Sequence, residues 1–370
     1  MSMGSWNPTT ETGYNMFEML SVVQKAVRRG DYELGGWGCE QLRGKYRNTM
    51  WNRLLITTSE DCFGVLTKEI VALWEKDQEQ KDDKNVADAM ALLCRARKSR
   101  DACYFACNFV IDTRKPREIK YTPEQASDYV KRLQHNYDQF GFEQESMFEE
   151  EKEPIYEWGE KEENGLCLQI AIDHRDMDMM GWHLDQLRNI DWSYIWEVYM
   201  DYAQTHFDGA LTDEIEGLRR ADMIFNAKRN PKNEIFISKA LMIFCYASDP
   251  RFASVKSSDF IQYHSTIDWT NIKVKPIKNC QLKDNTIPDF VFDCHTIKGK
   301  QRGKTDWDMT RDEQEALFPL EENDYFSHSS WIYTYEQDYR EGRMTEAAML
   351  PIRTYAMSHP ANPVEFIPYD

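Results

Sequence analysis

The sequence predicts a mainly α-helical protein, with two tandem duplicated helical bundles and an irregular C-terminal extension. Three observations support this fold class. Residues 24–70 align without a gap on residues 169–215. From residue 15 onwards, apolar residues recur at the i, i+3, i+4 and i+7 spacing of an amphipathic helix. After residue 255 these periods become short, and proline, aspartate and aromatic residues dominate.

The alignment of the two stretches is dense in residues that are seldom interchangeable. Fourteen of the 47 aligned positions are identical. They include Gly36-Trp37, which aligns with Gly181-Trp182, and Trp51, which aligns with Trp196. The tryptophans repeat in step with the apolar positions, so we expect them to pack in the core rather than to stack on nucleic-acid bases.

The first helical unit is predicted over residues 15–111, after a polar leader at 1–14. Gly30-Asp31 is a helix stop followed by an N-cap, and it separates the first two helices. Ser59, Glu60 and Asp61 are expected to cap the fourth helix. The charged run 76–84 is expected to be a solvated loop or a frayed helix end. Lys98 and Ser99 are interpreted as a capping and interface element. The unit is predicted to contain helices at 16–27, 32–42, 51–58, 65–75, 86–97 and 101–111.

An acidic connector is predicted over 112–163, with a helix at 126–140. Its part 145–163 is rich in glutamate and is expected to be solvated. The second unit, 164–254, is interpreted as a degenerate copy of the first, with helices at 166–172, 177–187, 194–202, 211–218 and 235–246. The extension 255–370 is expected to be irregular, with short helices at 311–317 and 330–341.

Composition limits the class of protein. The chain has 370 residues, 41% of them hydrophobic, which allows two domains with sizeable cores. The formal net charge of −18 disfavours binding of nucleic acid by the whole surface but allows a local basic patch. Residues 1–14 lack the features of a secretory signal, and no apolar run is long enough to span a membrane. We therefore expect an intracellular protein, cytoplasmic or viral, without membrane contact and without a cofactor or metal.

Several pieces of the first unit share their order and spacing with a known family. They are Val22–Arg29 with Gly30-Asp31, Gly36-Trp37, Arg53–Ile56, Ser59–Gly64, and Lys98-Ser99 before Tyr104. With these pieces the chain resembles the C-terminal helical region of the RarA/MgsA replication-associated recombination proteins, which are AAA+ relatives of clamp loaders. The resemblance covers about residues 17–110. It implies a collar-like fold that self-associates or binds a motor partner.

The ATPase module of that family has no counterpart in this sequence. Only the short leader precedes the matching region, and the P-loop pattern G-x-x-x-x-G-K-[ST] is missing. The nearest string, Gly299–Thr305, is one residue short of that pattern. The resemblance therefore implies the scaffold role of the family and not its motor activity.

The best candidate binding site is a basic segment at 273–304. It holds eight basic residues against three acidic ones, in a chain whose net charge is negative. Gly299 and Gly303 would let the backbone approach a phosphate closely. One hypothesis is a contact with nucleic-acid backbone, and the other is a basic loop that pairs with the acidic connector. The candidate cations are Lys273, Lys275, Lys278, Lys298, Lys300, Arg302 and Lys304.

Asp293 and His295 form the pattern D-x-H within this segment. Both side chains could serve as a general base or as metal ligands, yet the sequence suggests no third ligand. We expect them instead to fix the loop onto the helical body by hydrogen bonds. The sequence thus favours a non-catalytic scaffold or binding protein of DNA replication or repair. The alternatives are a structural or assembly protein, viral in one version, and an enzyme centred on Asp293 and His295.

Overall fold

The protein is mainly α-helical, as the sequence predicts. The computed structural model describes residues 8–62, 66–96, 98, 100–106, 109, 118–140, 156–247, 274–305, 308–309, 312–313, 316 and 345–347. These residues form helices, short 3-10 turns and two isolated β-bridges. They divide into two compact units. Unit 1 holds the described residues up to Asp101, those of 223–231 and those from 274 on, and unit 2 holds those of 102–222 and 232–247.

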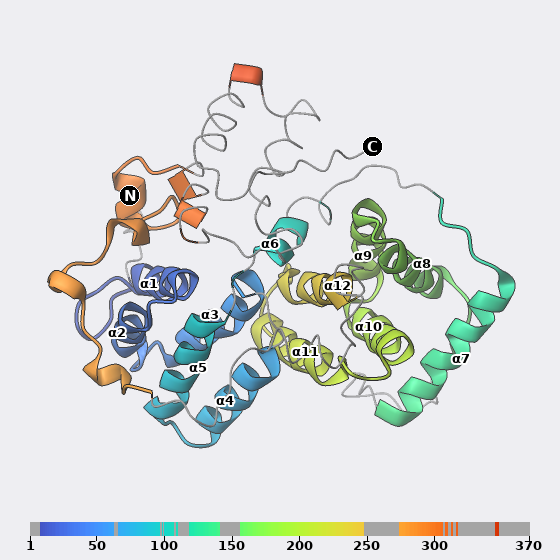
Figure 1. The fold of residues 1–370 in the computed structure, drawn as a ribbon, viewed down its shortest axis with the longest axis horizontal. Helices are drawn as coiled ribbons and strands as arrows, with labels where there is room; N and C mark the ends of the chain where they lie inside the picture. Colours follow the sequence, from blue (N-terminus) through green and yellow to red (C-terminus); the bar gives the residue numbers. More distant parts are fainter. Residues whose placement is uncertain are drawn as a thin grey trace, which may run out of the picture. The chain divides into compact units, whose positions relative to one another are not determined.

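The first part of unit 1 is a bundle of helices, coloured blue to cyan in Figure 1. The first helix packs against the second, third and fifth, and the fourth packs against the third and fifth. Their shared core contains fully buried side chains such as Val23, Trp51 and Leu54. The helices are α1 (Met16–Arg29), α2 (Tyr32–Leu42), α3 (Arg47–Glu60), α4 (Thr67–Glu79) and α5 (Asp83–Arg95), followed by α6 (Asp101–Phe105) at the boundary between the units.

Local sequence sets the turn between α1 and α2. Gly30 ends α1 in the left-handed region, with φ of 65°, where a residue without a Cβ is favoured. A Cβ at this position would also lie 3.1 Å from the carbonyl oxygen of Cys94. Asp31 then caps α2, because its side chain accepts the backbone N–H of Leu34 at 2.9 Å. The stop and the cap predicted at Gly30-Asp31 are therefore confirmed.

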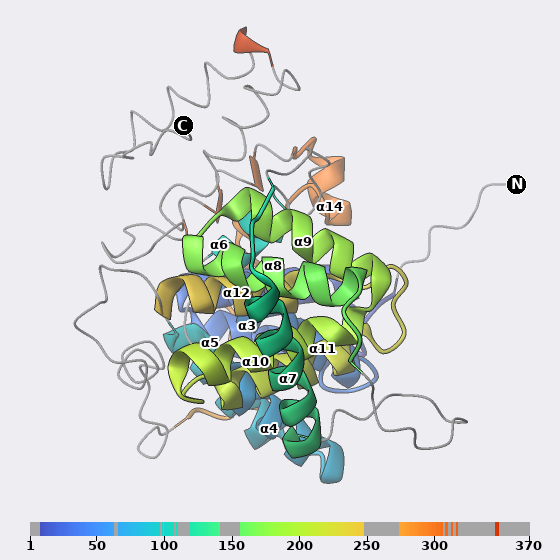
Figure 2. The ribbon, with the colours of Figure 1, turned by 90° about the vertical axis from the view of Figure 1, so that its right-hand side faces the viewer.

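Unit 2 is also helical, and it includes a helix from the predicted connector. This helix, α7, lies across α8 and α10 (Figure 2). It buries Tyr129 and Leu133, one turn apart on one face. Because this apolar stripe needs a partner surface, the predicted helix of the connector range 112–163 packs into unit 2, and the structure does not describe residues 141–155 of that range. The helices are α7 (Pro123–Phe140), α8 (Glu160–His174), α9 (Met177–Ile190), α10 (Trp192–Phe207), α11 (Thr212–Asn226) and α12 (Ile235–Ala247).

The helices of the two units begin in the register of the sequence alignment. The first residues of α2, α3 and α4 align with the first residues of α9, α10 and α11. Asp176 caps α9 through the N–H of Met179, as Asp31 caps α2 through Leu34. Arg175 adopts the left-handed conformation of the aligned Gly30. Unit 2 thus makes the same turn with an arginine where unit 1 has a glycine.

A buried tryptophan–aspartate hydrogen bond occurs at aligned positions in both units. In unit 1, the indole Nε1 of Trp51 donates to Asp77 Oδ2 at 2.7 Å. In unit 2, the indole Nε1 of Trp196 donates to Asp222 Oδ2 at 3.0 Å. Both carboxylates are almost completely buried. A buried carboxylate must receive hydrogen bonds, so each pair ties the third helix of its unit to the fourth.

A second buried polar contact involves aligned glutamines. Gln24 on α1 donates through Nε2 to Asp61 Oδ2 at 2.9 Å. Gln169 on α8 donates through Nε2 to Asp201 Oδ2, also at 2.9 Å. The two aspartates do not align in sequence, yet both are fully buried and accept the same donor. The first helix of each unit is therefore held to the region of the third helix by an aspartate.

Some sequence expectations are corrected by the packing. The charged run 76–84 was expected to be a solvated loop or a frayed helix end, but α4 extends to Glu79 and Asp77 is fully buried. The boundary between the compact units falls after Asp101, not after residue 111, because Phe105 and Phe109 pack in unit 2. Trp37, Trp51 and Trp196 are buried as expected, whereas Trp182 is only half-buried. The helix expected at 330–341, and most of the one at 311–317, lie outside the described residues.

None of the described helices combines the length and the apolar character needed to cross a bilayer.

A buried histidine in unit 2 carries a hydrogen bond on only one nitrogen. The amide of Asn164 donates through Nδ2 to the carbonyl of Glu160, so its Oδ1 faces His183 Nδ1 at 2.8 Å and accepts from it. The other nitrogen, Nε2, is buried with no hydrogen-bond partner among the described residues. A proton there would create a buried charge, and burial lowers the pKa of His183 to about 4.

We expect the stability of the protein to fall as His183 is forced to accept a proton. Its folded pKa lies below the unfolded value of 6.5, so between the two the unfolded chain binds the extra proton. The contribution is complete above about pH 6.5 and should decline by about 3 kcal/mol toward pH 4. Urea unfolding from pH 4 to pH 7 measures it, with His183→Leu as the comparison. Equal pH dependence in the two proteins would contradict this prediction.

Candidate functional site

The basic segment predicted at 273–304 is described from residue 274, and it forms a strap along unit 1. We use "strap" for residues 274–304. Pro276 and Pro288 each precede a 3-10 turn, where their fixed φ suits the start of a tight turn. The strap packs on α1, α2 and α5 and is drawn in orange in Figure 1. Its elements are η4 (Ile277–Asn279), η5 (Lys283–Asn285), η6 (Asp289–Val291) and α14 (Ile297–Gln301).

A buried lysine of α1 anchors the centre of the strap. The ammonium of Lys25 lies 2.8 Å from Asp293 Oδ2 and donates to the carbonyl of Phe290 at 2.6 Å. Ser21, one turn earlier on α1, donates to the carbonyl of Val291 at 2.7 Å. Only 3% of the Lys25 side chain is exposed. A buried ammonium requires such compensation, so the strap supplies the charge and the acceptors that let Lys25 remain inside.

Asp293 also organises the strap itself. Its Oδ1 accepts the backbone N–H of His295 at 2.9 Å, and its carbonyl accepts the hydroxyl of Thr296 at 3.0 Å. Burial by itself would raise the pKa of Asp293, but the hydrogen bond and charge of Lys25 hold it below its ordinary value. The expectation that Asp293 fixes the loop is therefore confirmed. His295 takes part through its backbone, and its side chain is exposed.

The sequence suggested that Gly299 lets the backbone approach a phosphate. In the structure Gly299 serves the packing of the strap instead. A Cβ on Gly299 would lie 1.8 Å from the carbonyl oxygen of Asp293, so only glycine fits there. Thr296 caps the short helix α14 through the N–H of Gly299. Gly303 follows in the left-handed region, with φ of 71°, and ends the turn.

Most of the candidate cations are paired within unit 1. Lys275 pairs with Glu33 of α2, and Lys298 lies 3.2 Å from the buried Glu18 of α1. Arg302 and Lys304 both pair with Asp289 of the strap. The described acids that neutralise the strap thus belong to α1, α2 and the strap itself. One of the two hypotheses from the sequence had placed these acids in the acidic connector. Lys273 lies outside the described residues.

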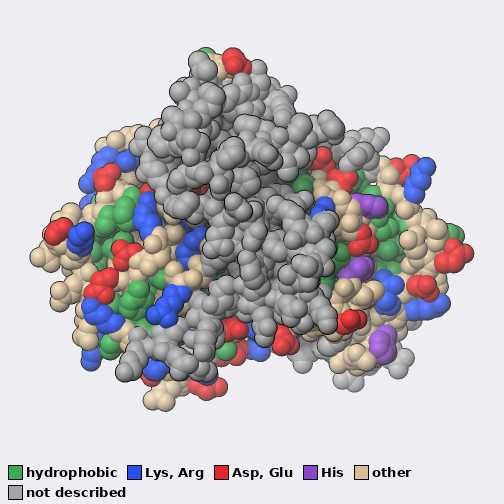
Figure 3. All heavy atoms as spheres, viewed as in Figure 1, with side chains coloured by type: hydrophobic (Ala, Val, Ile, Leu, Met, Phe, Trp, Pro, Cys, Tyr) green, Lys and Arg blue, Asp and Glu red, His purple; other side chains and the backbone are tan. Residues whose placement is uncertain are grey.

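Three lysines of the strap remain exposed without an ion pair to any described residue. They are Lys278, Lys283 and Lys300. Burial, and after it the charge of Asp83, raise the pKa of Glu40, whereas Arg43 and Lys278 lie close enough to lower it in part. On the described surface in Figure 3, basic and acidic side chains are interspersed. A contact with phosphates would therefore depend on these three lysines and not on the whole segment.

A second charged cluster lies around Asp61, next to the C-terminal end of α1, whose Arg28 is within one turn of Lys25. Arg28 donates through Nε to Asp61 Oδ1 at 2.5 Å, and Arg100 reaches the same oxygen at 3.2 Å. Glu313 pairs with both arginines at 3.1 Å. Burial would raise the pKa of Asp61, but the two arginines and Gln24 lower it. This network joins α1, the end of α3 and residues beyond the strap.

The capping role predicted for Ser59, Glu60 and Asp61 is wrong. α3 continues through Glu60, so Ser59 is a buried helical residue and Asp61 is the C-cap of α3. The next helix, α4, begins after Leu66 without a side-chain cap. The sequence pattern misled because a buried arginine pair competes for the Asp61 carboxylate more strongly than a helix N-terminus does.

The predicted capping role of Lys98 is confirmed. Its ammonium donates to the carbonyls of Leu93, Cys94 and Ala96 at the end of α5. These carbonyls have no partner within the helix, and a positive charge is favourable at a helix C-terminus. The neighbouring Ser99 lies outside the described residues.

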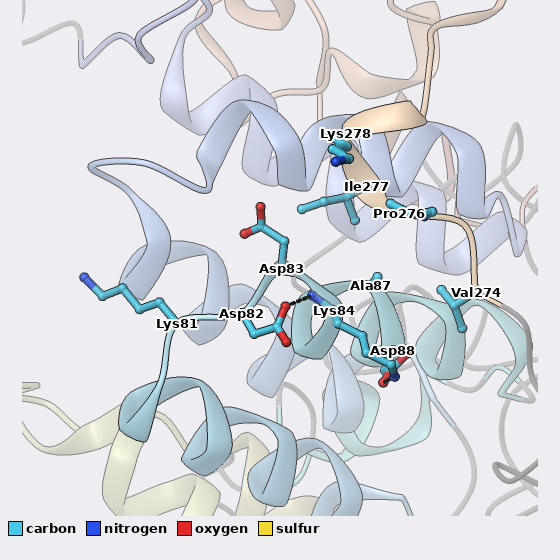
Figure 4. A pocket seen from close by; sticks show the side chains of 10 residues that line it. All are labelled: Lys81, Asp82, Asp83, Lys84, Ala87, Asp88, Val274, Pro276, Ile277 and Lys278. Atoms are coloured by element: carbon cyan, nitrogen blue, oxygen red, sulfur yellow. Dashed lines mark hydrogen bonds and ion pairs between the residues drawn. The ribbon is translucent and has the colours of Figure 1, made fainter.

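A cavity of about 740 Å³ separates the turn before α5 from the start of the strap (Figure 4). Its carboxylates already have partners: Asp83 pairs with Arg47 at 2.7 Å, Asp82 accepts the N–H of Lys84, and Asp88 pairs with the Lys84 ammonium. The apolar part of its wall comes from Ala87, Val274, Pro276 and Ile277. The aspartates of this cavity therefore stabilise the turn between α4 and α5.

Sequence reasoning missed the residues on α1 that organise the site. Lys25 lies among Val22, Val23 and Ala26, all of them fully buried. A lysine within a buried stripe is a signal that an acid from elsewhere in the fold must meet it. In the described part of the chain, no group of three or more His, Cys, Asp or Glu side chains is arranged to hold a metal ion.

The chain was compared with protein-family models, curated proteins and solved structures, and no significant match was found.

Replacement of Asp293 should release the strap. We expect Asp293→Ala to lower the free energy of unfolding by about 3 kcal/mol, because it leaves the buried Lys25 ammonium with only the more distant carboxylate of Asp312, 3.9 Å away. Tryptic cleavage after Lys283 should become faster by the same cause. Limited proteolysis and urea unfolding measure the two effects. Gln281→Ala, at an exposed position of the strap, is the control, and equal cleavage rates in the two variants would exclude the anchoring role.

Proposed function

We propose that the chain is a non-catalytic scaffold protein of DNA replication or repair, whose helical units hold polypeptide segments on their surfaces. The observation that carries the proposal is a pair of aligned glycines, Gly36 and Gly181. Each of them lies where a segment from outside the repeated region packs against the second helix of its unit.

The fit at both glycines is too close for any side chain. A Cβ on Gly36 would lie 2.6 Å from the sulfur of Cys280, a residue of the strap. A Cβ on Gly181 would lie 2.4 Å from the carbonyl oxygen of Phe109. Contacts below 3.0 Å are not tolerated by a real Cβ. The same position thus accepts an irregular strap in one unit and the backbone of Phe109 in the other, which supports segment binding as a property of the repeated unit.

The polar interior supports a rigid scaffold. Asp61, Asp77 and Asp201 are fully buried, and each receives hydrogen bonds from at least two side chains. Networks that are satisfied in this way hold helices in one arrangement. A surface that binds other segments benefits from such rigidity, because less order has to be imposed during binding.

The setting in replication or repair rests on the resemblance of residues 17–110 to the RarA/MgsA collar region. In that family the region self-associates beside an AAA+ motor. We propose that this chain likewise self-associates or binds an AAA+ or other replication protein, with the chemistry supplied by the partner.

Segment binding can be tested in trans with a labelled peptide of residues 274–304. The full-length Asp293→Ala chain should bind this peptide at least about tenfold more tightly than the wild type, because the intact strap competes for the same surface. Gly36→Val added to Asp293→Ala should abolish the gain, since its side chain occupies the place of Cys280. Fluorescence anisotropy provides the affinities. If none of the three proteins binds the peptide, segment binding by unit 1 is refuted.

A contact with nucleic acid is the second candidate function, favoured by the exposed lysines of the strap. In the same assay, a labelled DNA duplex should bind at low salt and dissociate as salt rises. Replacing Lys278, Lys283 and Lys300 together by alanine should reduce the slope of log binding constant against log salt concentration by up to about three. Lys275→Ala should reduce this slope by less, because Lys275 is already paired. The absence of binding at low salt would remove this candidate and leave the scaffold proposal standing.

A further inference from the structure

Unit 2 carries an open aromatic groove that the proposed function does not use. We use "aromatic groove" for a cavity of about 570 Å³ in front of the first turns of α7. Its lining includes the rings of Tyr121 and Trp158 together with Ala126 and Val130, which lie one turn apart on α7. Trp158 is 40% exposed, which makes it one of the most exposed large apolar side chains of the described residues.

The groove is held in shape by hydrogen bonds around it. The hydroxyl of Tyr121 donates to Glu163 Oε1 at 2.6 Å, so this ring is fixed to α8. The two rings meet edge to face, with centroids 5.3 Å apart. Thr122 and Gln125 form a reciprocal capping box at the start of α7, which fixes Tyr121 on one side and Pro123 on the other.

Aromatic rings beside small apolar side chains form the kind of surface that recognises polyproline II segments. Such a segment is extended before binding and loses little entropy, while its proline rings pack against aromatic faces. This chain contains a P-x-x-P motif, Pro360-Ala361-Asn362-Pro363, followed by Glu365. The motif lies outside the described residues.

Charge favours the same ligand. Lys131 lines the groove, and its side chain is 73% exposed. Its pairing with Asp128, at 3.6 Å and equally exposed, contributes little. Lys131 is therefore free to attract a carboxylate such as that of Glu365, which lies two residues after the second proline of the motif.

We propose that the aromatic groove binds the P-x-x-P segment 360–365 of a second copy of this chain. Each copy carries one groove and one segment, so two copies can exchange their segments reciprocally. A reciprocal exchange closes a two-fold dimer and uses both contacts at once, which strengthens a contact that is weak by itself. This proposal concerns unit 2 and does not depend on the binding of the strap in unit 1.

The first experiment measures self-association of the full-length chain. Sedimentation equilibrium over a roughly hundredfold range of concentration should show a monomer–dimer equilibrium. Trp158→Ala and the double variant Pro360→Ala/Pro363→Ala should each weaken it at least about tenfold, since an aromatic anchor dominates such a contact. Ile190→Ala is the matched control, because it removes an equally exposed apolar side chain of unit 2 outside the groove and should leave the equilibrium unchanged.

The second experiment tests the charge contact and the identity of the ligand. Lys131→Glu and Glu365→Lys should each weaken the dimer, and their combination should restore it. A labelled peptide of residues 357–370 should bind the Pro360→Ala/Pro363→Ala chain and not its Trp158→Ala derivative.

Three results would overturn the proposal. One is a dimer that is indifferent to Trp158→Ala. Another is a peptide that fails to bind any variant, which would leave the groove to a different protein. The third is a chain that stays monomeric at every concentration while its segment 360–365 still shields Trp158 from solvent. The segment in the groove would then come from the same copy.

Discussion

Buried carboxylates that must be hydrogen-bonded determine how the helices of each unit are placed. A carboxylate removed from water is costly unless donors converge on it, so its position dictates where the donor-bearing helices lie. Asp77 collects the indole of Trp51 and the guanidinium of Arg47, and Asp222 collects the indoles of Trp196 and Trp192. The third and fourth helices of both units are therefore held by one interaction, while the apolar core around it differs in detail.

The strap extends the same constraint to a segment far away in the sequence. Lys25 is a residue of α1 that could not remain buried without an acid and several acceptors, and Asp293, Phe290 and the neighbouring turn supply them. The cations of the strap then find carboxylates on α1 and α2. The basic segment that the sequence suggests for nucleic-acid binding therefore serves in large part to hold the strap on the helices of unit 1. The proposals therefore differ in where they place binding: on the helical surface that the strap covers, on its few exposed lysines, or on the aromatic groove of unit 2.

The sequence predicted the helices well because their signals are local. The gap-free alignment matched the paired helices to one another, although α3 begins at Arg47 and not at the predicted residue 51. Caps such as Gly30-Asp31 depend on neighbouring residues alone. The candidate site was predicted less well. Asp293 was recognised as a residue that fixes its loop, but its partner Lys25 is far away in the chain and nothing local reveals the pairing. Gly299 was assigned to phosphate binding because its contact with Asp293 exists only in the folded strap.

The amino-acid sequence by itself determined the helical class, the stop and cap at Gly30-Asp31, and the burial of Trp51 and Trp196. These features follow from periodicity and capping, which act over a few residues. Only the tertiary structure decided which charges are paired and which remain exposed. Asp61 was expected to cap a helix, but its carboxylate binds Arg28 and Arg100. Four of the candidate cations form ion pairs within unit 1. The reason is physical: the state of a charge depends on the groups that folding brings within a few ångströms, whatever their distance along the chain.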